Sequence, residues 1–598
     1  MLFKVIMFIL LLIIFVNTGL SQDYSEIVDY LDEGNISADE LEDIINEYKN
    51  NPVILSEVTR DDILGLPISV DLKYKILVNM KQFAGVSKWS DLSKIGFSEN
   101  EIAVIRLFFI IRKDDYKKYD IINFISLDNN YLNKYPLSKI KQQIVYSDRF
   151  LFTAFSNEMD QGEKSFFDSY KFAISLNVFH NRCELMAGSY RIKWGAGILF
   201  SNSLFSRFVR DGYNNIYISK SGVRQYIGYS EDHFLSGIAA KVNFRTGDIL
   251  IFYSKRNLDA RVNNDTVTKF ITSGYHVSQG EIISKNAVAE NLCGIGFNRS
   301  FNAGKCGILF GKMTYNKVIE FLCNDDDYSY ISLYHRMTFD KVSYVGEVAL
   351  IDKYISFIEG IKVDVNRVRI ATGYRRMNPY LFSRLGRSRK YFSSYNVNEE
   401  GFLFSIMKRF EIFNISFFLD FHRRIFDSDD TWSRLDRLYI YIPVRKKVNF
   451  GLDIYRDNPS SPNESLKMRF NIHYRIVKQF LFKNIIVMKL FKQELKSTLA
   501  MLSLRYEMVN WIVYIGISEY FNKAGSMSSI VEPSVSYNID LVNLYGNGHR
   551  FFIVFKGHIN DKFELNLAYK RNLEIDRKYD IKEKNRVVFQ TCYYLWDK

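Results

Sequence analysis

Apolar and polar residues alternate over long stretches of the chain, most clearly in its last third. In residues 468–476 every second side chain is apolar and those between are polar: Met468, Phe470, Ile472, Tyr474 and Ile476 against Arg469, Asn471, His473 and Arg475. The same period of two returns in residues 415–422, 448–455 and 563–570. Successive side chains of a β-strand point to opposite faces, so the pattern predicts strands with one apolar and one polar face.

Two architectures use such strands: a soluble sandwich with a dry core, and a membrane barrel with lipid outside and a polar lumen. The strands have about ten residues and run directly into hairpins with unequal loops on alternate sides, which is typical of tilted membrane-spanning strands. The last pattern, residues 586–596, suits a strand that closes a barrel. We therefore predict a mainly β fold, a large antiparallel transmembrane β-barrel of roughly 22 strands, with an even number expected.

Composition agrees with a barrel. The 598 residues include 49 Phe and 40 Tyr but only 8 Pro, which favours strands and supplies aromatic residues for the membrane interfaces. Beyond the first segment, no apolar run is long enough for a spanning helix. The net charge of +13 would suit anionic lipid headgroups or an anionic solute, although a solvated lumen and loops are the simpler interpretation.

The first 21 residues have the features of a cleaved secretory signal. Lys4 precedes an apolar core at residues 5–16, and the small residues Gly19 and Ser21 stand before Gln22. An uncleaved anchor helix is the weaker alternative because the apolar core is short. Together with the strands, the signal predicts the outer membrane of a diderm bacterium, with the N-terminal domain in the periplasm.

Residues 22–118 differ in kind from the rest and predict a small all-α domain. Capping boxes begin at Ser37 and Ser98, and Thr59 with Asp62 forms a near variant, so helix starts are marked at three places. Residues 119–143 are polar and weakly patterned, which indicates a linker. The barrel is then expected to occupy residues 144–598.

Residues 58–105, which include Asp62-Ile63-Leu64-Gly65-Leu66-Pro67, resemble a tandem helix-hairpin-helix domain of the type found in secreted DNA-uptake proteins. In that family a Pro-Gly-apolar-Gly turn directs backbone N–H groups at a DNA phosphate. The resemblance implies a nucleic-acid or partner contact at the matching turns: Pro67, Ile68, Ser69 and Val70, and Ile95, Gly96 and Phe97. Both glycines of the first turn are missing.

Charge also argues against DNA binding by this domain. Residues 23–62 carry 13 Asp and Glu against Lys49 and Arg60, and residues 63–118 carry 6 acids against 10 bases, a net charge of −7. A phosphate-binding domain should be basic. A structural module or a contact to a periplasmic protein is therefore the favoured interpretation.

A second resemblance covers most of the chain up to about residue 315. The glycine-spaced residues 188–199, followed by residues 222–226 and 231–237, look like the corresponding stretch of bacterial proteins that join a periplasmic helix-hairpin-helix domain to an outer-membrane β-barrel. The likeness implies an architecture and a location. It implies no reaction.

Glycines and a long polar stretch mark a candidate lumen element. Gly188, Gly195 and Gly197 permit close backbone approach or a kink where a strand turns inward. Residues 201–229 are too long for a hairpin turn and predict either a plug inside the lumen or an ordinary outer loop. In a plug, four basic residues would give a positive lining: Arg207, Arg210, Lys220 and Arg224.

Enzyme and metal signatures are sparse. The polar group His276, Ser278 and Glu281 is the only local cluster that stands out, and a catalytic role for it is not favoured. The five cysteines are odd in number and lack a C-x-x-C spacing, so neither a disulfide framework nor a metal site is predicted. No cofactor is expected.

Three functions follow from these patterns. The favoured one is a non-enzymatic outer-membrane barrel, surrounded by lipid, that passes or binds a solute, or that anchors a periplasmic partner through its helical domain. A component of DNA binding or uptake is the second. An outer-membrane hydrolase is the third.

Overall fold

A computed structural model describes residues 46–594, apart from residues 60–61, 64–65, 67, 69, 112–117, 129–138, 161, 164, 180–181, 201–220, 273, 275, 321–324, 381–382, 387–397, 426–431, 445–447, 459–463, 478, 509, 537, 539, 561 and 576–580. The predicted signal segment lies outside the described residues.

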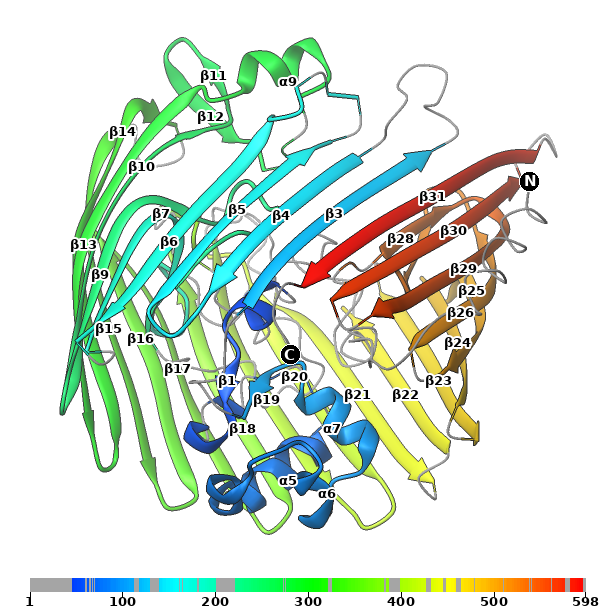
Figure 1. Ribbon diagram of the computed structural model, residues 1–598. Coiled ribbons are helices and arrows are strands. Elements are labelled where there is room, and N and C mark those ends of the chain that lie inside the picture. The colour runs from blue at the N-terminus through cyan, green and yellow to red at the C-terminus, as the bar shows by residue number, and fades with distance from the viewer. Residues whose placement is uncertain are drawn as a thin grey trace.

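Twenty-four strands form one closed antiparallel barrel (Figure 1). In chain order they are β3 (Lys118–Asp128), β4 (Lys139–Ser147), β5 (Leu151–Met159), β6 (Ser169–Val178), β7 (Cys183–Lys193), β9 (Leu235–Phe244), β10 (Gly247–Leu258), β13 (Val288–Phe301), β14 (Gly304–Ile319), β15 (Asp325–Phe339), β16 (Val342–Ile351), β17 (Tyr354–Val365), β18 (Val368–Met377), β19 (Glu399–Arg409), β20 (Asn414–Arg423), β21 (Ser433–Val444), β22 (Val448–Asp457), β23 (Ser465–Val477), β24 (Phe480–Phe491), β25 (Glu494–Glu507), β26 (Trp511–Asn522), β29 (Asn547–Asn560), β30 (Phe563–Ile575) and β31 (Ile581–Tyr594). The ring closes where β31 pairs with β3. The barrel is thus larger than the roughly 22 strands predicted, and the number is even.

The predicted linker at residues 119–143 is wrong, because β3 and β4 occupy much of it. The two strands pair with each other along Lys118–Ser126, so the barrel begins at Lys118. The alternation failed to reveal β3 because two of its lumen-facing residues, Ile122 and Phe124, are apolar and buried instead of polar. Ile122 belongs to the apolar core of the N-terminal region.

The two faces of the wall match the predicted alternation. On β23, Phe470 and Ile472 are 37% and 40% exposed on the outside, whereas Arg469 and Asn471 are 4% and 9% exposed on the inside. Apolar side chains therefore cover the outer face, as lipid contact requires. Among the described residues, no helix is long and apolar enough to cross a membrane.

The two ends of the barrel differ. At one end the connections are short, as at residues 245–246, 302–303 and 340–341. At the other end most connections are longer, although residues 352–353 and 492–493 form short turns there as well. The connection from β10 to β13 contains β11 (Ala260–Asn263), β12 (Thr266–Phe270) and α9 (Gln279–Ser284). Helices α5 (Val70–Asn79), α6 (Asp91–Lys94) and α7 (Glu99–Ile105) lie at the short-turn end, opposite α9 (Figure 1).

The N-terminal region is not purely helical in the part that the structure describes. Besides η1 (Leu55–Glu57), η2 (Met80–Gly85) and the three helices, β1 (Val53–Ile54) pairs in parallel with β2 (Phe109–Ile110). These short apolar segments suit a strand better than a helix end. The capping box predicted at Ser98 is present, since its Oγ accepts from the Glu101 N–H.

Candidate functional site

Strand β7 separates from its wall neighbour β6 at Gly188, while its pairing with β9 continues to Tyr190. This glycine has a φ of +91°, and a Cβ there would lie 2.1 Å from the carbonyl oxygen of Phe172 on β6. Beyond it the wall alternation stops, and Ser189, Tyr190, Arg191 and Ile192 are all buried. A short strand in the interior, β8 (Gly222–Gln225), then pairs with the end of β7. The continuation of a wall strand therefore enters the lumen.

The segment that follows β7 is fixed by one carboxylate to wall strand β16, six strands further along the ring. Glu347 on β16 accepts from the backbone N–H of Ile198 at 3.0 Å and from the Ser332 hydroxyl at 2.7 Å. Ser332 in turn accepts from Trp194 Nε1–H at 3.1 Å. A Cβ on Gly195, whose φ is +54°, would lie 2.7 Å from Glu347 Cδ. Glycine is thus required for this close approach.

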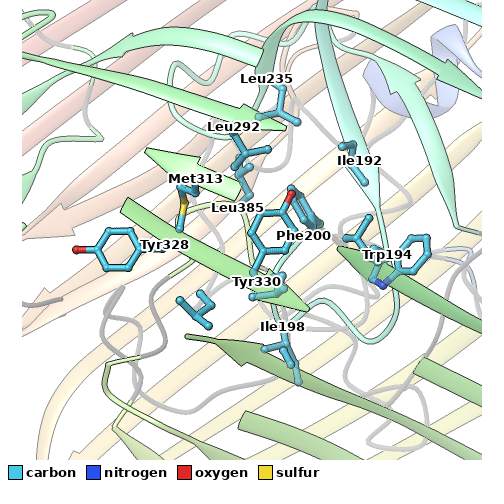
Figure 2. Close-up of a cluster of buried hydrophobic side chains, with 14 of the residues drawn as sticks. Ile192, Trp194, Ile198, Phe200, Leu235, Leu292, Met313, Tyr328, Tyr330 and Leu385 are labelled. Atoms are coloured by element: carbon cyan, nitrogen blue, oxygen red, sulfur yellow. The ribbon is translucent and has the colours of Figure 1, made fainter. Parts of the chain in front are cut away.

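Apolar packing fills the space around this anchor (Figure 2). Trp194 meets Tyr334 edge-on with ring centroids 5.2 Å apart, and Phe200 contacts Phe252 and Tyr330 at 5.5 and 5.8 Å. We call the inward-folded residues 189–200, 221–234 and 383–386 the luminal lobe. Its apolar core resembles that of a soluble domain built against the inner wall.

A buried ion-pair network holds the luminal lobe to β13. Arg384 is 1% exposed, and its guanidinium contacts Asp232 at 3.0 Å and Glu290 at 2.8 Å. Arg256 on β10 adds hydrogen bonds to the carbonyl oxygens of Glu231 at 2.6 Å and Asp232 at 3.1 Å. Segments from four parts of the chain are thereby joined through two arginine side chains.

The predicted plug residues are only partly placed. Arg207, Arg210 and Lys220 lie outside the described residues. Arg224 lies on β8, inside the barrel, and pairs in register with Arg191. The described end of the predicted plug is buried as well, since Tyr226 and Ile227 are 4% and 2% exposed.

The hairpin turns of the N-terminal region offer little to a phosphate. Ile68 and Phe97 are 4% and 3% exposed and belong to the apolar core. The N–H groups of Ile95, Gly96 and Phe97 donate to the carbonyl oxygens of Leu92 and Ser93. Val70 begins α5, and Pro67 and Ser69 lie outside the described residues. The second turn therefore already uses its backbone donors to end α6.

A second inward element was not recognised in the sequence. Strands β27 (Met527–Glu532) and β28 (Asp540–Tyr545) form a separate hairpin between β26 and β29. Glu532 is held by Arg550 at 2.5 Å and by Lys570 at 3.4 Å, and Gln590 Nε2–H donates to the Ser536 carbonyl at 2.6 Å. The length of the connection between β26 and β29 was the available signal.

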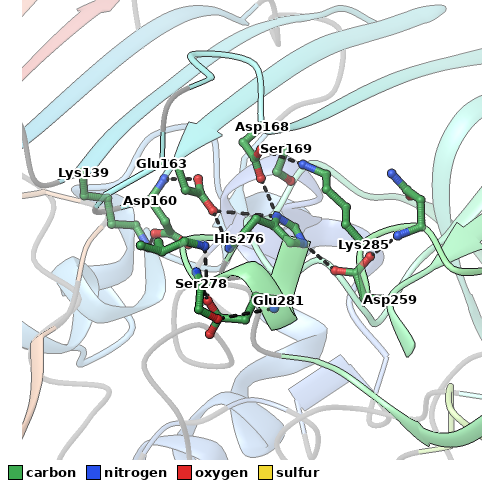
Figure 3. Close-up of polar contacts among 12 residues, drawn as sticks. Lys139, Asp160, Glu163, Asp168, Ser169, Asp259, His276, Ser278, Glu281 and Lys285 are labelled. Carbon is green, nitrogen blue, oxygen red and sulfur yellow. Dashed lines mark hydrogen bonds and ion pairs between the residues drawn. The ribbon is translucent and has the colours of Figure 1, made fainter. Parts of the chain in front are cut away.

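A charged cluster ties together the loops at the long-loop end (Figure 3). His276 contacts Asp168 through Nδ1 at 2.6 Å and Asp259 through Nε2 at 2.7 Å, and Lys285 contacts Asp168 at 2.6 Å. Ser278 and Glu281, which the sequence grouped with His276, instead form the capping box of α9. No nucleophile and base are brought together here by these three residues.

The same cluster is where the described chain could hold a cation. Glu163, Asp168 and His276 place three donor atoms within 4.8 Å of one another, and Glu231, Asp259 and His276 do the same. Carboxylate and imidazole groups are common ligands of divalent metals. Glu163 and Asp168 lie more than 100 positions before His276, and Asp259 lies 17 before it, so the spacing of these residues matches no metal-binding motif in the sequence.

The ion pairs of His276 predict that the loops at this end are held together more firmly at neutral pH than at high pH. Burial alone would lower the pKa of His276, but the hydrogen bonds to Asp259 and Asp168 outweigh it and raise the pKa to about 9. Because the pKa is raised on folding, the ion pairs of His276 stabilise the folded loops fully at pH values below the ordinary histidine pKa. This stabilisation is lost as pH rises through about 9. Proteinase K should therefore cut residues 271–287 slowly at pH 7 and faster at pH 10.

His276→Ala should be cut fast at both pH values, because it lacks the ion pairs with Asp168 and Asp259. His549→Ala, at an exposed position of β29, is the matched control and should keep the pH response of the unaltered protein. Equal protection of His276→Ala and the unaltered protein at pH 7 would contradict the assignment.

No known protein family and no curated protein matches this chain. Among solved structures, the siderophore receptor PirA from Acinetobacter baumannii has a TM-score of 0.40 at 7% identity, over 81% of this chain and 82% of that one. The ferric-catecholate import receptor Fiu from E. coli K12 has a TM-score of 0.36 at 8% identity, over 81% and 83%. The E. coli P pilus tip assembly intermediate PapC-PapD-PapK-PapG has a TM-score of 0.44 at 10% identity, over 81% and 62%.

These chains are similar to the present one as large β-barrels. At such low identity and TM-score the similarity supports no statement about ligand or partner.

Proposed function

We propose that this chain is a non-enzymatic outer-membrane barrel that passes a solute through a lumen narrowed by the luminal lobe. The observation that carries the proposal is the separation of β7 from β6 at Gly188 and the anchoring of its inward continuation by Glu347. A barrel of this size needs either a channel or a plug inside. A lobe joined to the wall by polar contacts and by apolar packing can act as the narrowing element.

The orientation follows from the two ends of the barrel. Short turns face the periplasm and long loops face the exterior in outer-membrane barrels. Helices α5, α6 and α7 lie at the short-turn end, which supports a periplasmic N-terminal region. The His276 cluster then lies on the outer side. Nothing in the described residues of the hairpin turns favours DNA as the passing solute.

Conductance in planar bilayers tests the proposal. Glu347→Ala removes the acceptor for the Ile198 N–H and the Ser332 hydroxyl, so the lobe should loosen and the single-channel conductance should rise several-fold over the unaltered protein. Heat-dependent mobility on a gel shows whether the barrel has folded.

Glu359→Ala is the matched control, because Glu359 lies on the outer face of the neighbouring strand β17 with 43% of its side chain exposed. It should leave the conductance unchanged. If folded Glu347→Ala conducts no more than the unaltered protein, the lobe does not narrow a path and the proposal fails.

A further inference from the structure

The two ring nitrogens of His276 face different partners (Figure 3). Nδ1 contacts Asp168 at 2.6 Å, and the other oxygen of that carboxylate contacts the Lys285 ammonium at 2.6 Å. Nε2 contacts Asp259 at 2.7 Å. Glu231, Asp259 and His276 each place one donor atom within 4.8 Å of the other two. Because Asp259 reaches Nε2, a cation held by these three residues meets the ring at Nε2.

Glu231 and Asp259 place two negative charges beside one imidazole. A proton on Nε2 makes one hydrogen bond, and at 2.7 Å that bond goes to Asp259. Glu231 brings a second negative charge within 4.8 Å of the Asp259 carboxylate, and like charges at that distance repel. Lys171 on β6 offsets part of the charge on Glu231. A divalent cation is coordinated by both carboxylates at once, which a single proton cannot achieve.

Neighbouring groups hold the donor atoms in place. With a metal on Nε2, Nδ1–H donates to Asp168, which is the arrangement that orients most metal-binding histidines. The backbone N–H of Asn286 donates to Asp259 Oδ1 at 2.8 Å, while Oδ2 contacts the ring. Both side chains therefore already have the outer hydrogen bonds that fix the orientation of a metal ligand.

Two contacts bring the backbone around His276 close to Glu231. Glu163 Oε1 accepts from the backbone N–H of His276 at 3.1 Å. Gly274 has a φ of +67°, and a Cβ there would lie 2.9 Å from Glu231 Cδ. The glycine thus lets the Glu231 carboxylate approach the chain two residues before His276.

We propose that Glu231, Asp259 and His276 Nε2 bind one divalent transition-metal ion, with Zn²⁺ as the best fit. An imidazole with two carboxylates suits Zn²⁺ better than Ca²⁺ or Mg²⁺, which prefer oxygen ligands. The ion takes the place of the Nε2 proton, which leaves to solvent. Metal–ligand distances of about 2.0–2.2 Å put ligand atoms roughly 3.5 Å apart, so the donor atoms move by only about 1 Å. The three protein ligands leave a fourth position for water.

The bound ion joins two parts of the protein. Glu231 belongs to the luminal lobe, whereas Asp259 and His276 belong to the connection between β10 and β13 at the long-loop end. Zn²⁺ therefore fastens the lobe to the outer loops. This inference goes beyond the proposed solute-passing function and does not depend on it.

Metal titration of the full-length protein in detergent tests the assignment. Untagged protein, stripped with EDTA and then dialysed, should bind one equivalent of Zn²⁺ by calorimetry, and Co²⁺ should give visible d–d absorption bands at the same stoichiometry. Glu231→Gln and Asp259→Asn each remove one ligand charge and should weaken Zn²⁺ binding at least tenfold. Asp168→Asn acts only through the His276 ring, so it should lower the affinity about 10- to 100-fold while keeping the Co²⁺ bands.

Asp265→Asn is the matched control. Asp265 lies in the turn between β11 and β12 of the same connection with 78% of its side chain exposed, and its φ of +62° suits asparagine. The variant loses the same charge and should bind Zn²⁺ like the unaltered protein. Heat-dependent mobility on a gel shows whether each variant has folded.

Hydrogen exchange tests whether the ion fastens the lobe to the loops. Zn²⁺ should slow the amide exchange of residues 276–287 several-fold in the unaltered protein and in Asp265→Asn, but not in Glu231→Gln. Zn²⁺ binding without slower exchange would show that the ion does not hold these segments together.

Three results would overturn the metal site. The first is the absence of stoichiometric Zn²⁺ binding, or binding that Glu231→Gln leaves unchanged. The second is loss of binding in Glu163→Gln but not in Glu231→Gln, which would place the ion at Nδ1 with Asp168. The third is Ca²⁺ or Mg²⁺ binding as tight as that of Zn²⁺. None of these measurements involves conductance, so the solute-passing proposal stands or falls separately.

Discussion

Arg384→Met is expected to destabilise the folded protein by about 3–5 kcal/mol, because it leaves two buried carboxylates without their counter-charge. Asp232 and Glu290 are 6% and 2% exposed, so water cannot replace the guanidinium. The luminal lobe should detach from β13, and the single-channel conductance should rise together with the loss of stability. Urea unfolding in detergent, followed by tryptophan fluorescence, measures the first effect and planar bilayers the second.

Neutralising all three members of this ion-pair network should restore the stability that Arg384→Met loses. Arg384→Met combined with Asp232→Asn and Glu290→Gln removes the unpaired charges, and a neutral replacement of a buried ion-pair group costs little or nothing. The triple variant should therefore recover most of the lost stability. Arg571→Met, in an exposed pair with Glu583 whose side chains are 44% and 42% exposed, should shift the free energy of unfolding by less than about 1 kcal/mol. A triple variant as unstable as the single one would contradict the charge argument.

Gly188→Val is expected to prevent assembly of the barrel. A backbone with left-handed φ costs a side-chain-bearing residue roughly 1–2 kcal/mol, and the added Cβ would lie 2.1 Å from a carbonyl oxygen of the paired strand β6. Strand β6 cannot retreat, because it is hydrogen-bonded to β5 on its other side. The folded, heat-modifiable band should be lost from gels, and outer-membrane fractions should contain little of the variant.

Gly280→Val is the matched control. Gly280 lies in α9, where a Cβ would meet nothing within 4 Å. This variant should assemble like the unaltered protein. Normal assembly of Gly188→Val would show that the inward turn of β7 does not need a glycine.

The wall was largely predictable from residue order. Alternation placed Phe470 outside and Arg469 inside, and the structure agrees at both positions. The strand prediction failed where the lumen side of the wall is covered by protein and not by water. Ile122 and Phe124 on β3 face other protein atoms instead of water, so the polar half of the alternation is absent and the strand was taken for a linker.

Local signals for helix starts also held at Ser98, because a capping box needs only residues three positions apart. The same signal at Ser278 was misinterpreted as part of a polar cluster with His276. The true partners of His276 are Asp168 and Asp259. Asp168 comes from the connection between β5 and β6, and Asp259 lies 17 positions before His276 at the start of the same long connection, so no local pattern joins the three residues.

By itself, the sequence determined the class of this protein: strands with a lipid face and a polar face, since the side-chain period of two depends only on backbone geometry. It also determined that Gly188 and Gly195 would permit unusual backbone approach. Only the tertiary structure decided that β7 separates from β6 and continues into the lumen, and that Glu347 and Arg384 fix its continuation. Those outcomes depend on strand register and on contacts between residues far apart in the chain. Both the register and these contacts are fixed only when the barrel closes.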